Sequence, residues 1–185
     1  MKTGALIVCC CLCLILTSCS LPHRVPQPDL EGKEQRAGQL LRIRVERWDT
    51  VRFSGLLGLQ KNAAGLQYVV LDATGVKLLE VAVAGDGSDK VLRLSGVLKN
   101  SDFGPFLSEA LARIYLQEGG GMGCIGSWLY QVCREESEDK GWVKYAQAGP
   151  FKVWRISAGA DAEAVVYHQP WLGLRIYLEP TKLSR

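Results

Sequence analysis

The chain has 185 residues, of which 48% are hydrophobic and 22% are charged. This composition is typical of a soluble globular domain, and the length suits one domain after a short leader. The formal net charge is only +3, which argues against a dedicated nucleic-acid-binding surface.

The first residues have the features of a secretory signal peptide. A short positive start, Met1–Thr3, is followed by a mostly apolar run from Gly4 to Leu16. A helix needs about 20 apolar residues to cross the hydrocarbon core of a bilayer, so this run is too short to span it. We therefore predict a signal peptide over residues 1–18.

A cysteine directly after this segment indicates a lipid anchor. The motif Leu16-Thr17-Ser18-Cys19 resembles the lipobox of bacterial lipoprotein precursors. The resemblance implies that Cys19 receives a diacylglyceryl group and becomes the acylated mature N-terminus. An ordinary cleavage site with an incidental cysteine is the alternative. Ser20 at the second mature position implies delivery to the outer membrane, with the body facing the periplasm.

Residues 19–37 are expected to form a flexible tether behind the lipidated cysteine. They include Pro22, Pro26 and Pro28 together with mixed charges, and they have few large apolar side chains. Such a segment cannot bury a core. Several acyl chains on Cys19 would hold the body on a membrane without a spanning helix.

From residue 38 onward most of the sequence has the period of β-strands. Leu41, Ile43 and Val45 alternate with polar residues, which is typical of a half-buried strand. Turn residues at 62–65, 72–75 and 85–89 separate the next strands, so we expect an antiparallel meander. Later strands are predicted at 127–133, 142–147, 151–157, 164–168 and 172–179.

One segment has the period of a helix instead. Apolar residues recur at helical spacing from Phe103 to Tyr115, with Ser101-Asp102 as a start signal and Gly119 as a stop signal. This predicts an amphipathic helix of about 16 residues and about 24 Å.

These elements predict a mainly β (α+β) domain over residues 38–185. We expect a curled antiparallel sheet or unclosed β-barrel with the one amphipathic helix packed in its concave face, because the apolar side of the helix must be covered. A fully closed barrel is the alternative.

Part of the body is similar to the LolA/LolB-like lipoprotein carriers, and most similar to their lipidated outer-membrane receptors. The similarity is carried by "RFSGLLGLQ" from residue 52, by the turn Asp72–Gly75 and by the strand Leu79-Glu80-Val81. It implies an unclosed antiparallel barrel capped by helices, with an apolar cavity that holds acyl chains. The family's turn carries an exposed leucine that is replaced here by Thr74.

The residues expected to line such a cavity lie on predicted strands and on the predicted helix. They are Phe53, Leu57, Leu79, Val81, Phe106, Leu107, Leu111, Ile114, Trp154 and Ile156. Other aromatic residues, among them Trp48, Trp128 and Trp171, could line the cavity or belong to an ordinary core.

Two cysteines of the body form a candidate disulfide. An even pair, Cys124 and Cys133, in an exported protein suggests a bond, and their spacing fits a hairpin. Two buried free thiols are the alternative.

No catalytic constellation is recognised in the sequence. His23 lies in the tether and His168 stands alone, and no metal-ligand motif or serine-centred motif is present. We expect no enzymatic activity, no metal and no cofactor.

Two functions remain open. The first is a membrane-anchored envelope lipoprotein that binds acyl chains of lipids or lipoproteins in an apolar half-barrel cavity, with a role in localisation or transport. The second is a non-enzymatic structural or assembly lipoprotein that binds another envelope protein.

Overall fold

The computed structural model describes residues 38–99, 101–117, 122–137, 141–160 and 164–181. These residues fall within one unit, Glu34–Arg185. The predicted signal peptide (residues 1–18) and tether (residues 19–37), including Cys19, lie outside the described residues. Within the described part of the chain, no helix is both long and apolar enough to cross a membrane.

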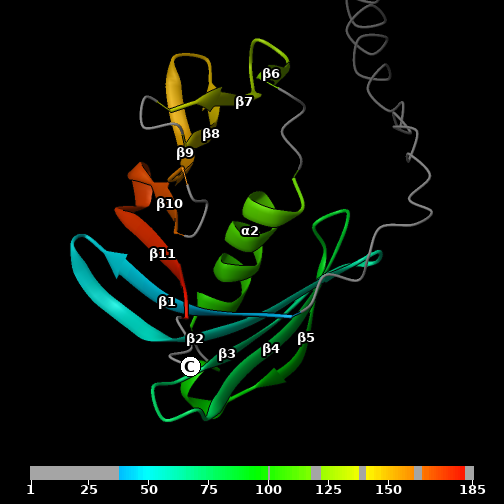
Figure 1. Cartoon of the computed structure of the whole chain (residues 1–185), viewed down its shortest axis with the longest axis vertical. Helices are drawn as coiled ribbons and strands as arrows, with labels where there is room; N and C mark the ends of the chain where they lie inside the picture. Colours follow the sequence, from blue (N-terminus) through cyan, green and yellow to red (C-terminus); the bar gives the residue numbers. More distant parts are fainter. Residues whose placement is uncertain (1–37, 100, 118–121, 138–140, 161–163, 182–185) are drawn as a thin grey trace, which may run out of the picture. The chain divides into compact units, whose positions relative to one another are not determined.

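Eleven antiparallel strands form one sheet that is not closed (Figure 1). The order is β5-β4-β3-β2-β1-β11-β10-β9-β8-β7-β6, so β5 and β6 are its edges and the first and last strands pair in its middle. The strands are β1 (Gln39–Arg47), β2 (Thr50–Asn62), β3 (Gly65–Leu71), β4 (Lys77–Ala84), β5 (Asp89–Leu94), β6 (Gly123–Gly126), β7 (Gln131–Glu136), β8 (Trp142–Ala148), β9 (Phe151–Ala158), β10 (Val165–Gln169) and β11 (Leu174–Pro180). The mainly β class and the unclosed antiparallel sheet are confirmed, and the closed barrel is wrong.

The predicted turns of the first half form through short side-chain contacts. The Asn62 side chain accepts hydrogen bonds from the backbone N–H groups of Ala64 and Gly65 at 2.9 and 3.0 Å. Asp72 accepts the N–H groups of Thr74 and Val76 at 2.8 and 2.9 Å. Asparagine and aspartate favour turns because their short side chains reach backbone groups two to four residues ahead.

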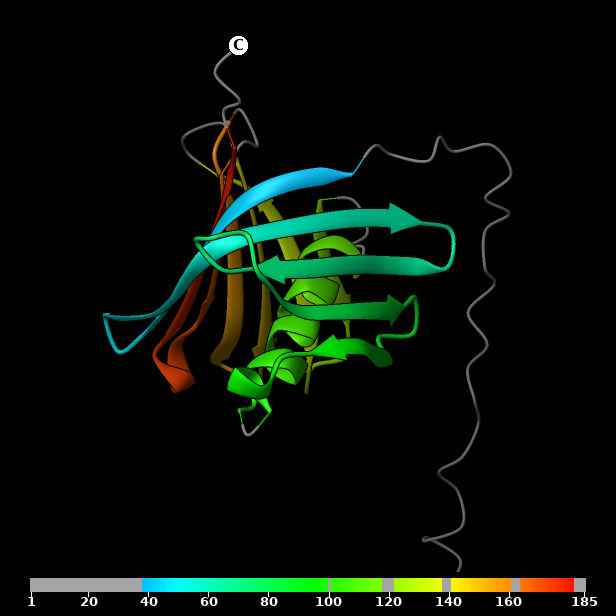
Figure 2. The same ribbon diagram turned by 90° about the horizontal axis from the view of Figure 1, so that it is seen from below.

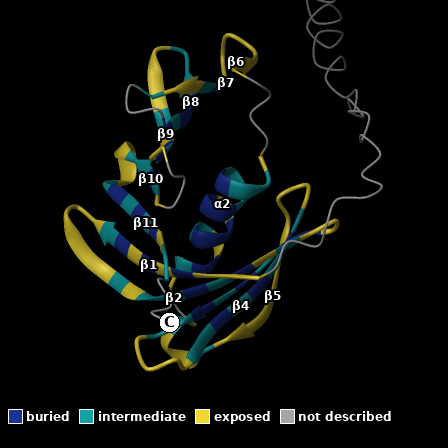
Figure 3. Ribbon diagram, in the orientation of Figure 1, coloured by how far each residue is buried: buried dark blue, intermediate teal, exposed yellow. Residues whose placement is uncertain are grey.

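Alternation along the strands places one side of each strand in the core (Figure 3). In β1, Leu41, Ile43 and Val45 are buried while Arg42 and Arg44 are exposed. Because successive side chains of a strand point to opposite faces, the polar residues between them reach solvent. The same alternation in β2, β4, β9 and β11 contributes to a single hydrophobic core.

Three helical segments occur among the residues that the structure describes. They are the α-helix α2 (Phe103–Tyr115) and the short 3₁₀ turns η1 (Gly96–Leu98) and η2 (Pro170–Leu172). Helix α2 contacts β4, behind which it is seen in Figure 2. It is shorter than the predicted helix of about 16 residues and begins at Phe103, directly after the predicted start signal Ser101-Asp102.

Two predicted strands have wrong boundaries. The strand expected at 127–133 is interrupted, because Ser127 and Tyr130 exchange backbone hydrogen bonds and close a turn between β6 and β7. The last strand begins at Leu174 and not at residue 172, because Pro170 starts η2 and Gly173 ends it with a left-handed φ of 59°. Leu172 is therefore exposed and does not share the buried face of β11.

The candidate cysteine pair is joined by a disulfide. Cys124 on β6 lies directly opposite Cys133 on β7, with their Cα atoms 3.9 Å apart. Alternating strand positions explain the pairing, because two residues that face each other across a narrow hairpin point to the same side of the sheet.

Candidate functional site

The structure brings the ten predicted cavity residues together in one apolar interior. Eight of them are buried, and Phe53 and Phe106 are half-buried and packed against the same core. They come from β2, β4, β9 and α2, which are distant in sequence. Together with other residues they fill the core, and they line none of the surface pockets described below.

Helix α2 contributes its apolar side to this interior. Leu107, Ala110 and Leu111 are fully buried, and Ile114 is nearly so. Glu109 lies on the opposite side and is exposed. The spacing of three and four residues explains this division, because such residues lie on the same face of a helix.

Two lysines from different strands bind the carboxyl-terminal end of α2. Lys144 on β8 is only 4% exposed, and its Nζ donates to the carbonyl groups of Arg113, Gln117 (2.8 Å) and Ile114 (3.5 Å). Lys61 on β2 donates to the carbonyl of Tyr115 at 2.9 Å. Carbonyl groups in the last turn of a helix lack partners within the helix and favour a nearby cation. The two lysines therefore satisfy this end of α2 from two sides.

Burial changes the protonation of Lys144. Loss of hydration, followed by the like charges of Arg134 and Lys61, lowers its pKa from the ordinary 10.5 to about 8. The side chain is therefore mostly protonated at pH 7.

A tyrosine from β3 holds the first half of α2. The Tyr68 hydroxyl lies 2.8 Å from Ser108 Oγ and donates to the carbonyl of Gly104 at 3.3 Å. Both Tyr68 and Ser108 are buried, and burial raises the pKa of the Tyr68 hydroxyl. Two neutral hydroxyl groups can fulfil their hydrogen bonds with each other and with a backbone carbonyl inside an apolar interior. These contacts therefore position the helix at little electrostatic cost.

An arginine on α2 makes the third set of polar contacts. Arg113 donates to the Tyr167 hydroxyl on β10 and to the Glu109 carboxylate, both at 2.5 Å. Its guanidinium also lies 5.5 Å from the Trp154 ring, within the range of a cation–π contact. Arg113 therefore joins the helix to β9 and β10.

None of these polar contacts was predicted from the sequence. The one usable signal is at Lys144, which shares its strand face with Trp142 and Ala146 and so occupies a position where an apolar residue is expected. Tyr68 and Arg113 fit ordinary strand and helix patterns. Tyr68 is 40 residues from its partner Ser108, and Arg113 is 54 residues from its partner Tyr167, so no local pattern indicates these contacts.

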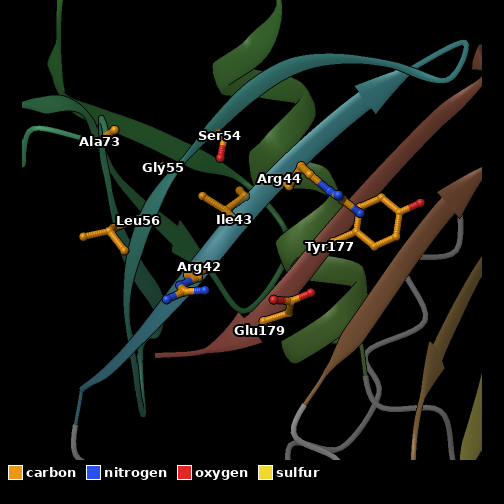
Figure 4. Close-up of a pocket in the computed structure, with 9 residues that line it drawn as sticks. All are labelled: Arg42, Ile43, Arg44, Ser54, Gly55, Leu56, Ala73, Tyr177 and Glu179. Carbon is orange, nitrogen blue, oxygen red and sulfur yellow. The ribbon is translucent and has the colours of Figure 1, made fainter. Parts of the chain in front are cut away.

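Two of the surface pockets border β1 and α2. One of about 330 Å³ is lined on β1, β2 and β11 by residues that include Arg42, Arg44, Tyr177 and Glu179. Figure 4 shows these side chains in front of the strands, with α2 behind them. A second pocket of about 330 Å³ lies between the exposed side of α2 and the turn between β4 and β5.

The aromatic residues that the sequence left open lie in different environments. Trp154 and Tyr167 are fully buried in the core. Trp48, Trp128 and Trp171 are exposed and take no part in it. Sequence alone left open whether each would line a cavity or belong to a core, and for these three tryptophans neither description holds.

No group of three histidine, cysteine, aspartate or glutamate residues that could hold a metal ion occurs among the residues that the structure describes. The arrangement beside α2 is thus an apolar interior with a few polar contacts at its edges. No model of a known protein family matches the chain, and no curated protein matches it.

Proposed function

We propose that this chain is an envelope lipoprotein that binds acyl chains of lipids or lipoproteins in a localisation or transport role. In this proposal α2 packs in the concave face of the sheet, and the acyl chain takes the place of the helix's apolar side. Cys19 anchors the protein to the outer membrane, with the body facing the periplasm. The role involves no chemical reaction.

One observation carries the proposal: an apolar core joins α2 to strands of both arms of an unclosed sheet. The two arms are β5 to β1 and β11 to β6 in the order of the sheet. Leu79 and Val81 on β4 belong to one arm, and Trp154 and Ile156 on β9 belong to the other. Leu111 on α2 is in the same core. The edge strands β5 and β6 of the sheet do not pair with each other, so its apolar interior is not enclosed by a complete barrel. Such an interior offers the surface that an acyl chain needs.

The contacts of α2 are compatible with its displacement. Among the described residues, its polar contacts to the sheet come from four sheet side chains, Lys61, Tyr68, Lys144 and Tyr167, so a limited set of hydrogen bonds has to break. Burying an acyl chain contributes about 0.8 kcal/mol per CH₂ group. A long chain can therefore offset the loss of the apolar contacts of one short helix.

Binding of a fluorescent fatty-acyl probe to residues 34–185 tests the proposal. We expect saturable binding that tightens roughly fourfold for each added CH₂ group, because 0.8 kcal/mol corresponds to that factor. Amide hydrogen exchange in residues 103–115 should become faster when the probe binds, since the helix leaves its place. Binding without dependence on chain length, or without a change in these amides, would contradict it.

A conservative variant separates displacement of α2 from adsorption to the surface. Tyr68→Phe removes the hydroxyl that contacts Ser108 and Gly104, which weakens the hold on the helix by about 1 kcal/mol. Probe affinity should rise about fivefold. Tyr177→Phe, on the pocket shown in Figure 4, is the matched control and should leave affinity unchanged. Weaker binding by Tyr68→Phe would count against displacement.

A second candidate function is supported by the edge strand β5. All six of its residues are exposed, including Val91, Leu92 and Leu94, and among the described strands β5 pairs only with β4. An exposed edge can accept a strand from a partner, so the chain could instead be an assembly lipoprotein that binds another envelope protein. A photo-crosslinker at Leu92 in envelope membranes should then capture one discrete protein.

A further inference from the structure

Four turns follow one another along one end of the sheet and carry exposed apolar side chains. Because neighbouring strands are antiparallel, the turns between β1 and β2, β10 and β11, β8 and β9, and β6 and β7 all lie at this end. Figure 3 shows the tip of the β1–β2 hairpin and the η2 turn as exposed. We call the following residues the aromatic rim: Trp48, Trp128, Leu129, Phe151, Trp171 and Leu172.

The side chains of the aromatic rim are far more exposed than is usual for large apolar residues. Trp48 is 62% exposed, Trp128 is 79% exposed and Trp171 is 64% exposed. They are three of the five tryptophans of the chain. Single exposed apolar residues are common, but a run of large aromatic residues along adjacent turns marks an interaction surface.

Contacts between neighbouring turns make the aromatic rim continuous. The N–H of Trp48 donates to the carbonyl of Gly173 at 2.7 Å, and a side chain at Gly173 would come within 2.3 Å of the Trp48 ring. The rings of Phe151 and Trp171 meet edge to face with centroids 5.9 Å apart.

Backbone bonds and an indole bond complete this connection. Trp171 Nε1 donates to the carbonyl of Lys152 at 3.0 Å, and the N–H of Gly149 donates to the carbonyl of Leu129 at 3.2 Å. The four turns are therefore linked from β1 to β6. These contacts position Trp48, Phe151 and Trp171 outside the core.

The backbone at Trp48 is strained. Trp48 and Asp49 form the two-residue turn between β1 and β2 with φ angles of 52° and 58°. Such turns favour asparagine and glycine because other residues, bulky ones above all, pay in stability for a positive φ. The indole gains little burial in return, since Trp48 is 62% exposed and its ring contacts only the backbone at Gly173 among the contacts described above. Strain that is kept for so small a packing benefit points to a function for the exposed side chain.

Positive charge surrounds the aromatic rim. The four turns and the strand residues beside them, 47–52, 126–131, 148–152 and 169–175, contain four basic residues and a single acidic one. The acidic residue, Asp49, is paired with Arg175 at 2.6 Å. Arg47, Arg52 and Lys152 are exposed, so these four turns have an excess of positive charge that complements an anionic surface.

We propose that the aromatic rim is a membrane-contact surface that seats the body on an anionic lipid bilayer. Tryptophan rings prefer the interface between headgroups and acyl chains, because they are apolar with one polar edge. Lysine and arginine beside them are attracted to anionic headgroups. The positive charge beside these rings complements the anionic headgroups of a lipid surface, which favours a bilayer as the partner. This surface does not depend on acyl-chain binding between the sheet and α2.

Tryptophan quenching in vesicles tests this surface with the full chain. The first tryptophan is Trp48, so residues 1–47 contribute no tryptophan signal even when they insert into the bilayer. The chain is reconstituted in vesicles of phosphatidylcholine and phosphatidylglycerol in equal parts, with bromine on the acyl chains. We expect strong quenching in the wild type and almost none in the triple variant Trp48→Ser, Trp128→Ser, Trp171→Ser, which keeps only Trp142 and Trp154.

Charge variants show whether the lipid headgroups contribute. In the anionic vesicles, Arg52→Gln and Lys152→Gln should each lower the ratio of bilayer-contacting to non-contacting protein about fivefold. Neither should have much effect in vesicles of phosphatidylcholine alone. The double variant Val91→Ser, Leu92→Ser, on the exposed strand β5, is the matched control and should leave quenching unchanged.

Three results would overturn the proposal. The first is equal quenching in the wild type and the triple tryptophan variant. The second is a loss of quenching in the β5 control as large as in the charge variants. The third is no quenching of the wild type in either kind of vesicle. The last result would leave the aromatic rim to a protein partner. Far-ultraviolet circular dichroism and the denaturation midpoint of each variant verify that the fold is intact.

Discussion

Trp154 and Trp171 are the same residue type in opposite environments. Trp154 on β9 is fully buried, and its ring lies beside Arg113 of α2. Trp171 on η2 is 64% exposed, and its ring meets Phe151 on a neighbouring turn. The interior aromatic residues hold the sheet and α2 together, whereas those of the aromatic rim are ordered but contribute little burial. Composition alone therefore says nothing about what a tryptophan does in this chain.

The largest expected effect comes from removing the interior tryptophan. Trp154→Ala should lower the free energy of unfolding by about 3–5 kcal/mol, because it leaves a large cavity in a close-packed core. Chemical denaturation followed by circular dichroism measures the change. A loss below about 1 kcal/mol would mean that the interior is loosely packed, and the contrast with the aromatic rim would then fail.

The disulfide is expected to have the next largest effect. Replacing Cys124 and Cys133 together by serine opens a closed loop of about ten residues and should cost roughly 2–3 kcal/mol of unfolding free energy. The same denaturation experiment measures it, with reduced wild-type protein as the comparison. A loss below about 1 kcal/mol would show that this hairpin is stable without the bond.

The buried lysine predicts a particular dependence of stability on pH. Between pH 8 and 10.5 the unfolded chain keeps the proton on Lys144 and the folded chain loses it, since burial lowers the folded pKa to about 8. The free energy of unfolding should therefore rise with pH in this window, by up to about 1.4 kcal/mol per pH unit.

Lys144→Met removes this dependence, and Lys152→Met on the exposed side of the aromatic rim should retain it. Denaturation midpoints at several pH values provide the measurement. A flat profile in the wild type, or a fall in stability over the same window, would show that the bonds to the carbonyl groups at the end of α2 keep Lys144 charged.

The smallest effect is expected at the aromatic rim itself. Trp171→Ala should change the unfolding free energy by about 0.5 kcal/mol or less, because the side chain is mostly exposed and loses one hydrogen bond and one ring contact. Comparison with Trp154→Ala under identical conditions sharpens the contrast. A loss as large as that of Trp154→Ala would mean that the aromatic rim is part of the stabilising core.

Much of the fold follows from local patterns in the sequence. Alternation identified Leu41, Ile43 and Val45 as one buried side of β1, and Asn62 and Asp72 indicated turns that form as expected. Prediction was wrong at residues 127–133, where four turn residues without a strong turn signature separate two short strands. It also placed the start of the last strand at Leu172, because a leucine in an alternating pattern was read as part of the strand that follows it.

The site was predicted less completely than the fold. The ten apolar residues chosen from their patterns do meet in one interior, because alternation and helical period indicate which face is buried. The polar contacts that hold α2 were missed, since Lys144 lies 27 to 31 residues from the carbonyl groups it binds. No local pattern carries that information.

The sequence by itself determined most of the strands, where one amphipathic helix lies, and which side of these elements is apolar. These are local properties, and they follow from the periods of the strand and the helix. Only the tertiary structure decided which elements become neighbours: it paired β1 with β11, buried Trp154, and gathered Trp48, Trp128 and Trp171 at one end of the sheet. The physical reason is that strand order and register depend on contacts between residues far apart in sequence, which a local pattern cannot specify.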